Sequence, residues 1–150
     1  MSERSVTHDK FTIERTYDAP PRRVFSAWSE PAAKARWFGP GDSHELDFRV
    51  GGSEHLAVRG PDGSMYSFDS LYQDIVPDQR IVYAYDMHRE QTRISVSLAT
   101  IEFKPAGEGT LLVLTEQGAF LDGQDDPALR VTGTGGLLER LAAELESERP

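Results

Sequence analysis

The feature of this sequence that most constrains its fold is the alternation of polar and apolar residues from Glu54 to Gln117. Alternation with a period of two is typical of β-strands that bury one face and leave the other in water. Most of the aromatic side chains here keep one phase along each strand, and Met87 shares it. These side chains are Tyr66, Phe68, Tyr72, Tyr83, Tyr85 and Met87. The sequence therefore predicts an antiparallel sheet with an aromatic inner face.

Turn signals divide this region and its flanks into strands. We expect strands at residues 10–17, 45–50, 53–59, 64–75, 79–88, 93–104 and 110–117. Pro61-Asp62-Gly63 predicts a turn, because proline presets one backbone position and glycine permits the next. In the strand at 93–104 the apolar residues change phase, and a change of phase requires an extra residue. We therefore predict a β-bulge near Ala99 or Thr100 that bends the sheet.

Helical patterns flank the predicted strands. Pro20 and Pro21 predict the start of a short helix, and Pro31 ends it and begins a second one. We expect a loop at 118–123, an extra turn at 125–131, and a final helix after Gly136 with an apolar side from Leu138 to Leu145. The predicted fold is α+β: a curved antiparallel sheet of about seven strands, with two short helices after the first strand and a long C-terminal helix packed across it. Such an arrangement tends to leave a cavity.

Length and composition limit the class of protein. The 150 residues fit one domain, 1–150, in which we expect residues 1–9 to be flexible. A hydrophobic content of 38% is that of a globular chain. No apolar run approaches the roughly 20 residues that span a bilayer, and residues 1–10 lack the apolar core of a signal peptide. We therefore expect a cytoplasmic protein with no membrane partner.

Charge and cysteine content exclude further classes. The net charge of −9 opposes binding to nucleic acid and to anionic membranes. The absence of cysteine excludes disulfides, thiolate zinc sites and a cysteine nucleophile. There is no Gly-x-Ser-x-Gly elbow and no phosphate-binding loop. We expect neither a metal nor another cofactor, while a homodimer stays open.

Two acidic residues share the phase of apolar neighbours. Glu54 has the phase of Leu56, and Glu116 has that of Leu114. A buried carboxylate must be paired, protonated or hydrogen-bonded, so these residues are candidates to fix the polar end of a ligand or to act as general acid and base. The alternative is that one or both lie at a strand end in water.

Aromatic residues supply the other candidates for a ligand site. Buried tyrosines need a partner for the hydroxyl group and can serve as ligand donors, although packing in the core explains the aromatic residues equally well. Trp28, Trp37 and Phe38 either narrow a cavity or pack the short helices on the sheet. The full set of candidate ligand-binding residues is Trp28, Trp37, Phe38, Glu54, Tyr66, Phe68, Tyr72, Tyr83, Tyr85, Met87, Glu116, Phe120, Leu138 and Leu141.

Asp86 and His88 also share one face, which is the spacing of a catalytic pair. Tyr85 and Met87 take the inner face of the same strand, so we expect Asp86 and His88 to form a solvated outer pair. Arg93 is expected on the outer face too, although an inward arginine would make an acidic ligand attractive.

Several short motifs, taken in order, resemble a known family. They are Asp18-Ala19-Pro20, Val24-Phe25, Trp28, Trp37-Phe38, Gly51-Gly52, Gly60-Pro61-Asp62-Gly63, Gly109-Thr110 and Thr115 to Phe120. The chain resembles the SRPBCC superfamily, which has the START-like, helix-grip or Bet v-like fold, and within it bacterial homologues of the activator of heat-shock protein 90 ATPase. The resemblance covers about Phe11 to Leu145. It implies a central cavity between the sheet and the C-terminal helix.

Three functions follow as hypotheses. The first is a protein that binds a small apolar or aromatic molecule. The second is an enzyme on the same scaffold, such as a cyclase, dehydratase or hydrolase of a polyketide-like or aromatic substrate. The third is a chaperone co-factor or protein-interaction module. The third is disfavoured, because the eukaryotic activators carry a separate N-terminal domain and this chain starts almost at its first strand.

Overall fold

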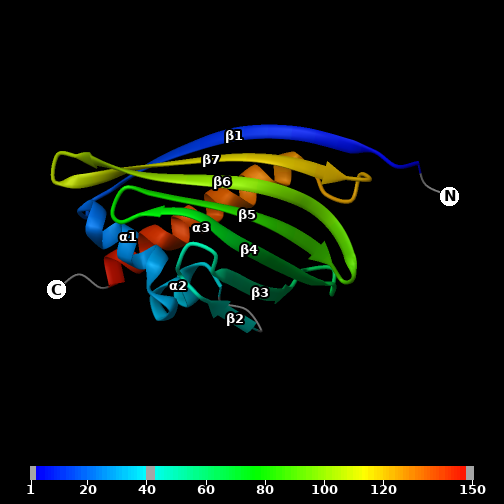
Figure 1. Cartoon of the computed structure of the whole chain (residues 1–150), viewed down its shortest axis with the longest axis horizontal. Helices are drawn as coiled ribbons and strands as arrows, with labels where there is room; N and C mark the ends of the chain where they lie inside the picture. Colours follow the sequence, from blue (N-terminus) through cyan, green and yellow to red (C-terminus); the bar gives the residue numbers. More distant parts are fainter. Residues whose placement is uncertain (1–2, 40–42, 148–150) are drawn as a thin grey trace.

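The computed structural model describes residues 3–39 and 43–147. The elements in chain order are β1 (Val6–Tyr17), α1 (Pro21–Ser29), α2 (Pro31–Trp37), β2 (Ser43–Leu46), β3 (Ser53–Arg59), β4 (Met65–Val76), β5 (Arg80–Arg89), β6 (Thr92–Ala106), β7 (Gly109–Leu121) and α3 (Pro127–Ser147). Figure 1 shows α3 running along one face of the curved sheet, with α1 and α2 close to the C-terminal end of α3.

The strands form one sheet in the order β1-β7-β6-β5-β4-β3-β2, and all neighbours are antiparallel. This arrangement confirms the predicted α+β helix-grip fold, with its seven strands, two short helices and long C-terminal helix. Within the described part of the chain, no helix has the length and apolar character needed to cross a membrane.

Prolines set the limits of the short helices, as predicted. α1 begins at Pro21. The first N–H groups of a helix have no carbonyl partner within the helix, so proline, which lacks an N–H, costs no hydrogen bond at this position. Glu30 precedes Pro31 and therefore adopts an extended backbone, which ends α1 and allows α2 to begin. The buried face of α1 places Trp28 against Trp37 of α2, with ring centroids 4.8 Å apart.

Hydrogen bonds and ion pairs join α3 to the rest of the core. The Tyr17 hydroxyl donates to the carbonyl of Leu138 at 3.0 Å, which links β1 to α3. Arg36 of α2 makes a bidentate ion pair with Glu144, whose Oε2 lies 2.6 Å from Nη2 of Arg36. These contacts fasten the second half of α3 to β1 and to α2.

The first and last strands are longer than predicted. β1 begins at Val6, and residues 6–9 pair with residues 118–121 of β7. Residues 1 and 2 of the stretch expected to be flexible lie outside the described residues. β7 continues to Leu121 through the expected loop. Gly118 pairs with Asp9 and Ser97 in the ladder, and a Cβ there would lie 2.9 Å from Oγ of Ser97, so a larger residue would have to displace that hydroxyl.

The predicted bulge near Ala99 or Thr100 is wrong. These residues pair in unbroken register with Tyr83 and Val82. The register of β6 against β5 shifts earlier, and the extra residue is Ile94. A bulge therefore does bend β6, but at the end of the strand that borders the polar part of the cavity.

The reason for this error is that β6 carries apolar residues on both its inner and its outer face. Val96 and Leu98 point outward and are 46% and 38% exposed. The inner positions beside them are Ser95 and Ser97, which are buried because they accept hydrogen bonds from Arg130. Polar inner positions and apolar outer ones invert the usual pattern of a half-buried strand.

Two further boundaries differ from the prediction. The strand expected at 45–50 ends at Leu46, and Val50 lies exposed in the following turn. The extra turn at 125–131 and the final helix are one element, α3, which continues through Gly133, Gly135 and Gly136. Glycine destabilises a helix interior by only about 1 kcal/mol relative to alanine, so packing against the sheet keeps the helix continuous.

Candidate ligand cavity

A cavity of about 420 Å³ lies between the inner face of the sheet and α3. This volume is within the range of small-molecule sites, roughly 300–1,000 Å³. Most of its walls are apolar or aromatic. Each strand from β3 to β7 contributes side chains from its inner face. The apolar and aromatic lining residues are Trp28, Trp37, Phe38, Leu56, Val58, Tyr66, Phe68, Tyr83, Tyr85, Met87, Ile94, Leu114, Leu129, Leu137 and Leu138.

The cavity reaches the surface beside the first half of α3. Leu129 is 65% exposed and Val58 on β3 is also exposed, yet both line the cavity. Gly133 lies one turn after Leu129 on the same side of the helix, and a Cβ built on it would meet no atom within 4 Å. We call the surface around Leu129, Gly133 and Val58 the mouth of the cavity.

The polar end of the cavity centres on Glu116. This residue projects inward from β7 and is only 5% exposed. The hydroxyl of Tyr85, two strands away on β5, donates a short hydrogen bond to Oε1 of Glu116. The contact spans β6, where the inner residues paired with Tyr85 and Glu116 are the small Ser97 and Ala99.

Arg130 of α3 completes the polar end. Its Nη1 donates to the Tyr85 hydroxyl at 2.9 Å and to Ser97 at 3.4 Å. Its Nη2 donates to Ser95 at 2.8 Å and to Asp125 at 2.7 Å. The guanidinium also lies 3.7 Å from Oε1 of Glu116, so one buried cation joins α3 to both neighbouring carboxyl groups.

Burial and these contacts shift the protonation equilibria in the polar end. Burial raises the pKa of Glu116, although Tyr85 and Arg130 oppose the shift. Burial and the neighbouring Glu116 also raise the pKa of Tyr85. Burial would lower the pKa of Arg130, but the oxygens of Tyr85, Glu116 and Asp125 outweigh it and raise the pKa. The site thus holds a permanent cation beside a carboxyl group whose pKa lies above its ordinary value.

The structure brings most of the predicted site residues together. Ten of the fourteen line the cavity: Trp28, Trp37, Phe38, Tyr66, Phe68, Tyr83, Tyr85, Met87, Glu116 and Leu138. The other four, Glu54, Tyr72, Phe120 and Leu141, are buried but do not line it. Both predicted acids therefore face inward, as their phase predicts, and only Glu116 reaches the cavity.

Glu54 belongs to a separate buried cluster. Nζ of Lys34, on α2, lies 2.6 Å from Oε1 of Glu54, and both side chains are fully buried. Tyr72 and His44 also bond this carboxylate, at 3.0 and 2.7 Å. Burial acts to raise the pKa of Glu54, but Lys34 and the hydrogen bonds outweigh it and lower the pKa. Burial lowers the pKa of Lys34. Glu54 is therefore a charged partner that fixes α2 to β3.

Two important residues escaped the sequence interpretation, Arg130 and Lys34. A signal for Arg130 was present: a helix begun at Pro127 places Arg130, Thr134 and Leu138 on one side at spacings of four. For Lys34 the signal was the acid itself, since a carboxylate facing the interior requires a cation nearby. Neither signal identifies the strand whose side chains Arg130 or Lys34 contacts.

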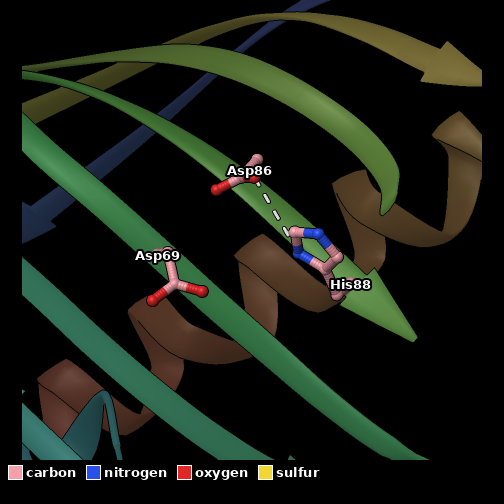
Figure 2. A group of neighbouring side chains, drawn as sticks. All are labelled: Asp69, Asp86 and His88. Atoms are coloured by element: carbon pink, nitrogen blue, oxygen red, sulfur yellow. Dashed lines mark ion pairs between the residues drawn. The ribbon is translucent and has the colours of Figure 1, made fainter. Parts of the chain in front are cut away.

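One group of side chains has the atoms to hold a metal ion. Asp69, Asp86 and His88 rise together from β4 and β5 (Figure 2), and their ligand atoms lie within 4.8 Å of one another. They lie on the outer face, as predicted for Asp86 and His88. His55 bonds Asp69 at 2.6 Å and Arg93 bonds Asp86 at 2.9 Å. The Arg93 guanidinium therefore already pairs with Asp86, and the His55 ring occupies one oxygen of Asp69.

Comparison with known proteins places this geometry in a family. Residues 18–146 match the family described as Activator of Hsp90 ATPase homolog 1-like protein. The solved structure of an uncharacterized protein from Rhizobium leguminosarum is 45% identical, with a TM-score of 0.94 over 98% of this chain and 100% of that chain. Mll3558 from Rhizobium loti is 50% identical, with a TM-score of 0.88 over 93% and 99%. No curated protein matches this chain.

More distant structures share the fold alone. CalU16 from Micromonospora echinospora is 22% identical, with a TM-score of 0.69 over 95% of this chain and 85% of that chain. A curved sheet that grips a long C-terminal helix defines the helix-grip class of α+β proteins, the SRPBCC superfamily. Within that class the chain belongs to the family of Activator of Hsp90 ATPase homolog 1-like proteins.

Proposed function

We propose that this protein binds a small apolar or aromatic molecule in the cavity between the sheet and α3. The observation that carries the proposal is the cavity itself: about 420 Å³, aromatic walls, an open mouth and a polar end built on Glu116 and Arg130. Sites for small molecules combine mostly apolar walls with a few convergent polar groups. A module that acts only through its surface has no need of such a space in its core.

Two matched variants on β6 test the location of binding. Ile94→Phe adds a ring to the cavity wall, whereas Val96→Phe adds the same ring to the outer face. Two-ring aromatic compounds such as naphthalene are titrated by calorimetry against the wild type and each variant. We expect the wild type and Val96→Phe to bind alike and Ile94→Phe to bind more weakly. Equal weakening by both variants, or no binding by the wild type, would contradict the proposal.

A second candidate function is acid–base catalysis on the same scaffold. The observation that favours it is Glu116, a buried carboxyl group with a raised pKa beside the Tyr85 hydroxyl in a cavity. Such groups are typical of general acids and bases. The substrate would be an aromatic or polyketide-like compound, on which a cyclase, dehydratase or hydrolase acts.

Mass spectrometry separates the two candidates. Native spectra of the freshly purified protein, compared with denatured spectra, identify any compound that remains bound. That compound is then incubated with the wild type and with Glu116→Gln, and its mass is followed over time. A change of mass that only the wild type produces indicates an enzyme. An unchanged compound that both proteins bind indicates a binding protein.

A further inference from the structure

The arginine in the polar end is not available as a receptor for anions. The two terminal nitrogens of Arg130 carry four N–H groups, and four acceptors surround them: Tyr85, Ser97, Ser95 and Asp125. The remaining N–H, on Nε, offers a single donor. Recognition of a carboxylate by arginine normally uses two parallel hydrogen bonds, and no such pair of donors is left here.

The charges around Arg130 also disfavour an anionic ligand. Asp125 neutralises the guanidinium at 2.7 Å, and Glu116 lies on its other side at 3.7 Å. Counted together, these three groups carry no net charge when Glu116 is protonated and one negative charge when it is ionised. A ligand carboxylate would have to give up its water beside two acidic side chains, which is costly.

Glu116 provides the point of attachment that Arg130 does not. Its Oε1 is occupied by the Tyr85 hydroxyl. No residue of the described ranges donates to Oε2, and the side chain lines the cavity. A hydroxyl group both donates and accepts, so it pairs with this carboxyl group in either protonation state, whereas a carboxylate can only accept.

We propose, resting on the binding function proposed above, that the polar end takes the hydroxyl group of a neutral aromatic ligand and discriminates against a carboxylate in the same place. The aromatic walls hold the rings, and Glu116 holds the hydroxyl. The ligand class is thus a neutral phenol or aryl alcohol rather than an aromatic acid.

Three compounds that share one ring system test this proposal. Naphthalene, 2-naphthol and 2-naphthoate are titrated against the wild-type protein by calorimetry at neutral pH, where the naphthol is neutral and the naphthoate is charged. One hydrogen bond to a carboxyl group strengthens binding roughly tenfold, so 2-naphthol should bind about ten times more tightly than naphthalene. The naphthoate should bind more weakly than naphthalene.

The outcomes separate this inference from the binding function. Equal affinities for naphthalene and 2-naphthol, or a preference for the naphthoate, would overturn the inference and leave the cavity a binding site. Failure of all three to bind would overturn the binding function and the inference with it. The wild-type series decides the question without any variant.

A pair of variants checks that Glu116 is the cause. Glu116→Gln removes the acidic group, so the ratio of affinities for 2-naphthol and 2-naphthoate should fall by roughly tenfold towards one. Glu108→Gln changes the net charge equally at an exposed turn outside the cavity and should keep the wild-type ratio. If both variants keep it, Glu116 does not discriminate between the ligands and the inference fails.

Discussion

Leucine in place of Gly133 tests how the cavity opens. Gly133 lies at the mouth, between Leu129 and Leu137 on one side of α3, and a Cβ there meets no atom within 4 Å. No clash therefore opposes the substitution. A leucine would continue the apolar stripe of the helix and partly close the mouth.

The effect on stability can be worked out from helix energetics. Glycine is about 0.8–1.0 kcal/mol less favourable than alanine inside a helix, and leucine ranks just below alanine, so the exchange of glycine for leucine stabilises the helix by slightly less than this. Apolar pairs four residues apart, here with Leu129 and Leu137, add about 0.2–0.5 kcal/mol each. The sum is about 1.5 kcal/mol in the free energy of unfolding, which raises the Tm of a domain of this size by roughly 3–6 °C.

Gly135 supplies the matched control. It lies two residues further along α3, where a Cβ would make an ordinary contact at 3.6 Å with Arg15 and does not enter the cavity. Gly135→Leu should raise the Tm through helix propensity alone, and it should leave ligand binding unchanged. Gly133→Leu should raise the Tm and slow the association of 2-naphthol by about tenfold.

Differential scanning calorimetry and stopped-flow binding measure the two effects. The reasoning fails if Gly133→Leu associates with the ligand as fast as Gly135→Leu, because the mouth would then lie elsewhere. It also fails if Gly133→Leu lowers the Tm, since the space above Gly133 would not be open.

The remaining predictions concern the two buried glutamates and the link between β1 and α3. Lys34→Met and Glu54→Gln should each cost about 3–5 kcal/mol in urea unfolding, and the double variant less than their sum, because each single change strands a buried partner; additive costs would contradict the pairing. The raised pKa of Glu116 gives stability that is complete below about pH 4.3, the pKa of an unfolded glutamate, and is lost as the pH rises through the folded value. Wild type should therefore lose stability relative to Glu116→Gln as the pH rises above about 4.3, and a gain would refute the direction of the shift. The lowered pKa of Glu54 predicts the opposite slope below about pH 4.3, so wild type should lose its advantage over Glu54→Gln on acidification. Tyr17→Phe removes the bond to Leu138 and should cost about 1 kcal/mol of unfolding free energy, with no change in the affinity for ligand.

Local chemistry explains why so much of the fold could be predicted. Proline positions determine where α1 and α2 begin, and alternation identifies the inner faces of β4 and β5, including Tyr83 and Tyr85. These signals act within a few residues of the element that they define, so one sequence suffices to find them. The inward direction of Glu54 and Glu116 followed from the same alternation.

The parts that escaped prediction depend on contacts between distant segments. Ser95 and Ser97 are buried because Arg130 crosses from α3 to meet them, and that pairing inverts the pattern of β6. Glu54 does not line the cavity, because its carboxylate pairs with Lys34 of α2. In both cases a buried cation decides the role of its neighbours, and its reach is set by the packing of a helix on the sheet.

The central claim is that a ligand occupies the space between the sheet and α3. The most direct test is the measurement of NOEs between 2-naphthol and the methyl groups of the isotope-labelled protein. We predict NOEs to Met87, Ile94, Leu114 and Leu138, which line the cavity, and none to Val96 and Leu98 on the outer face of the same sheet. NOEs confined to Val96 and Leu98, or a ligand that contacts neither set, would contradict the account.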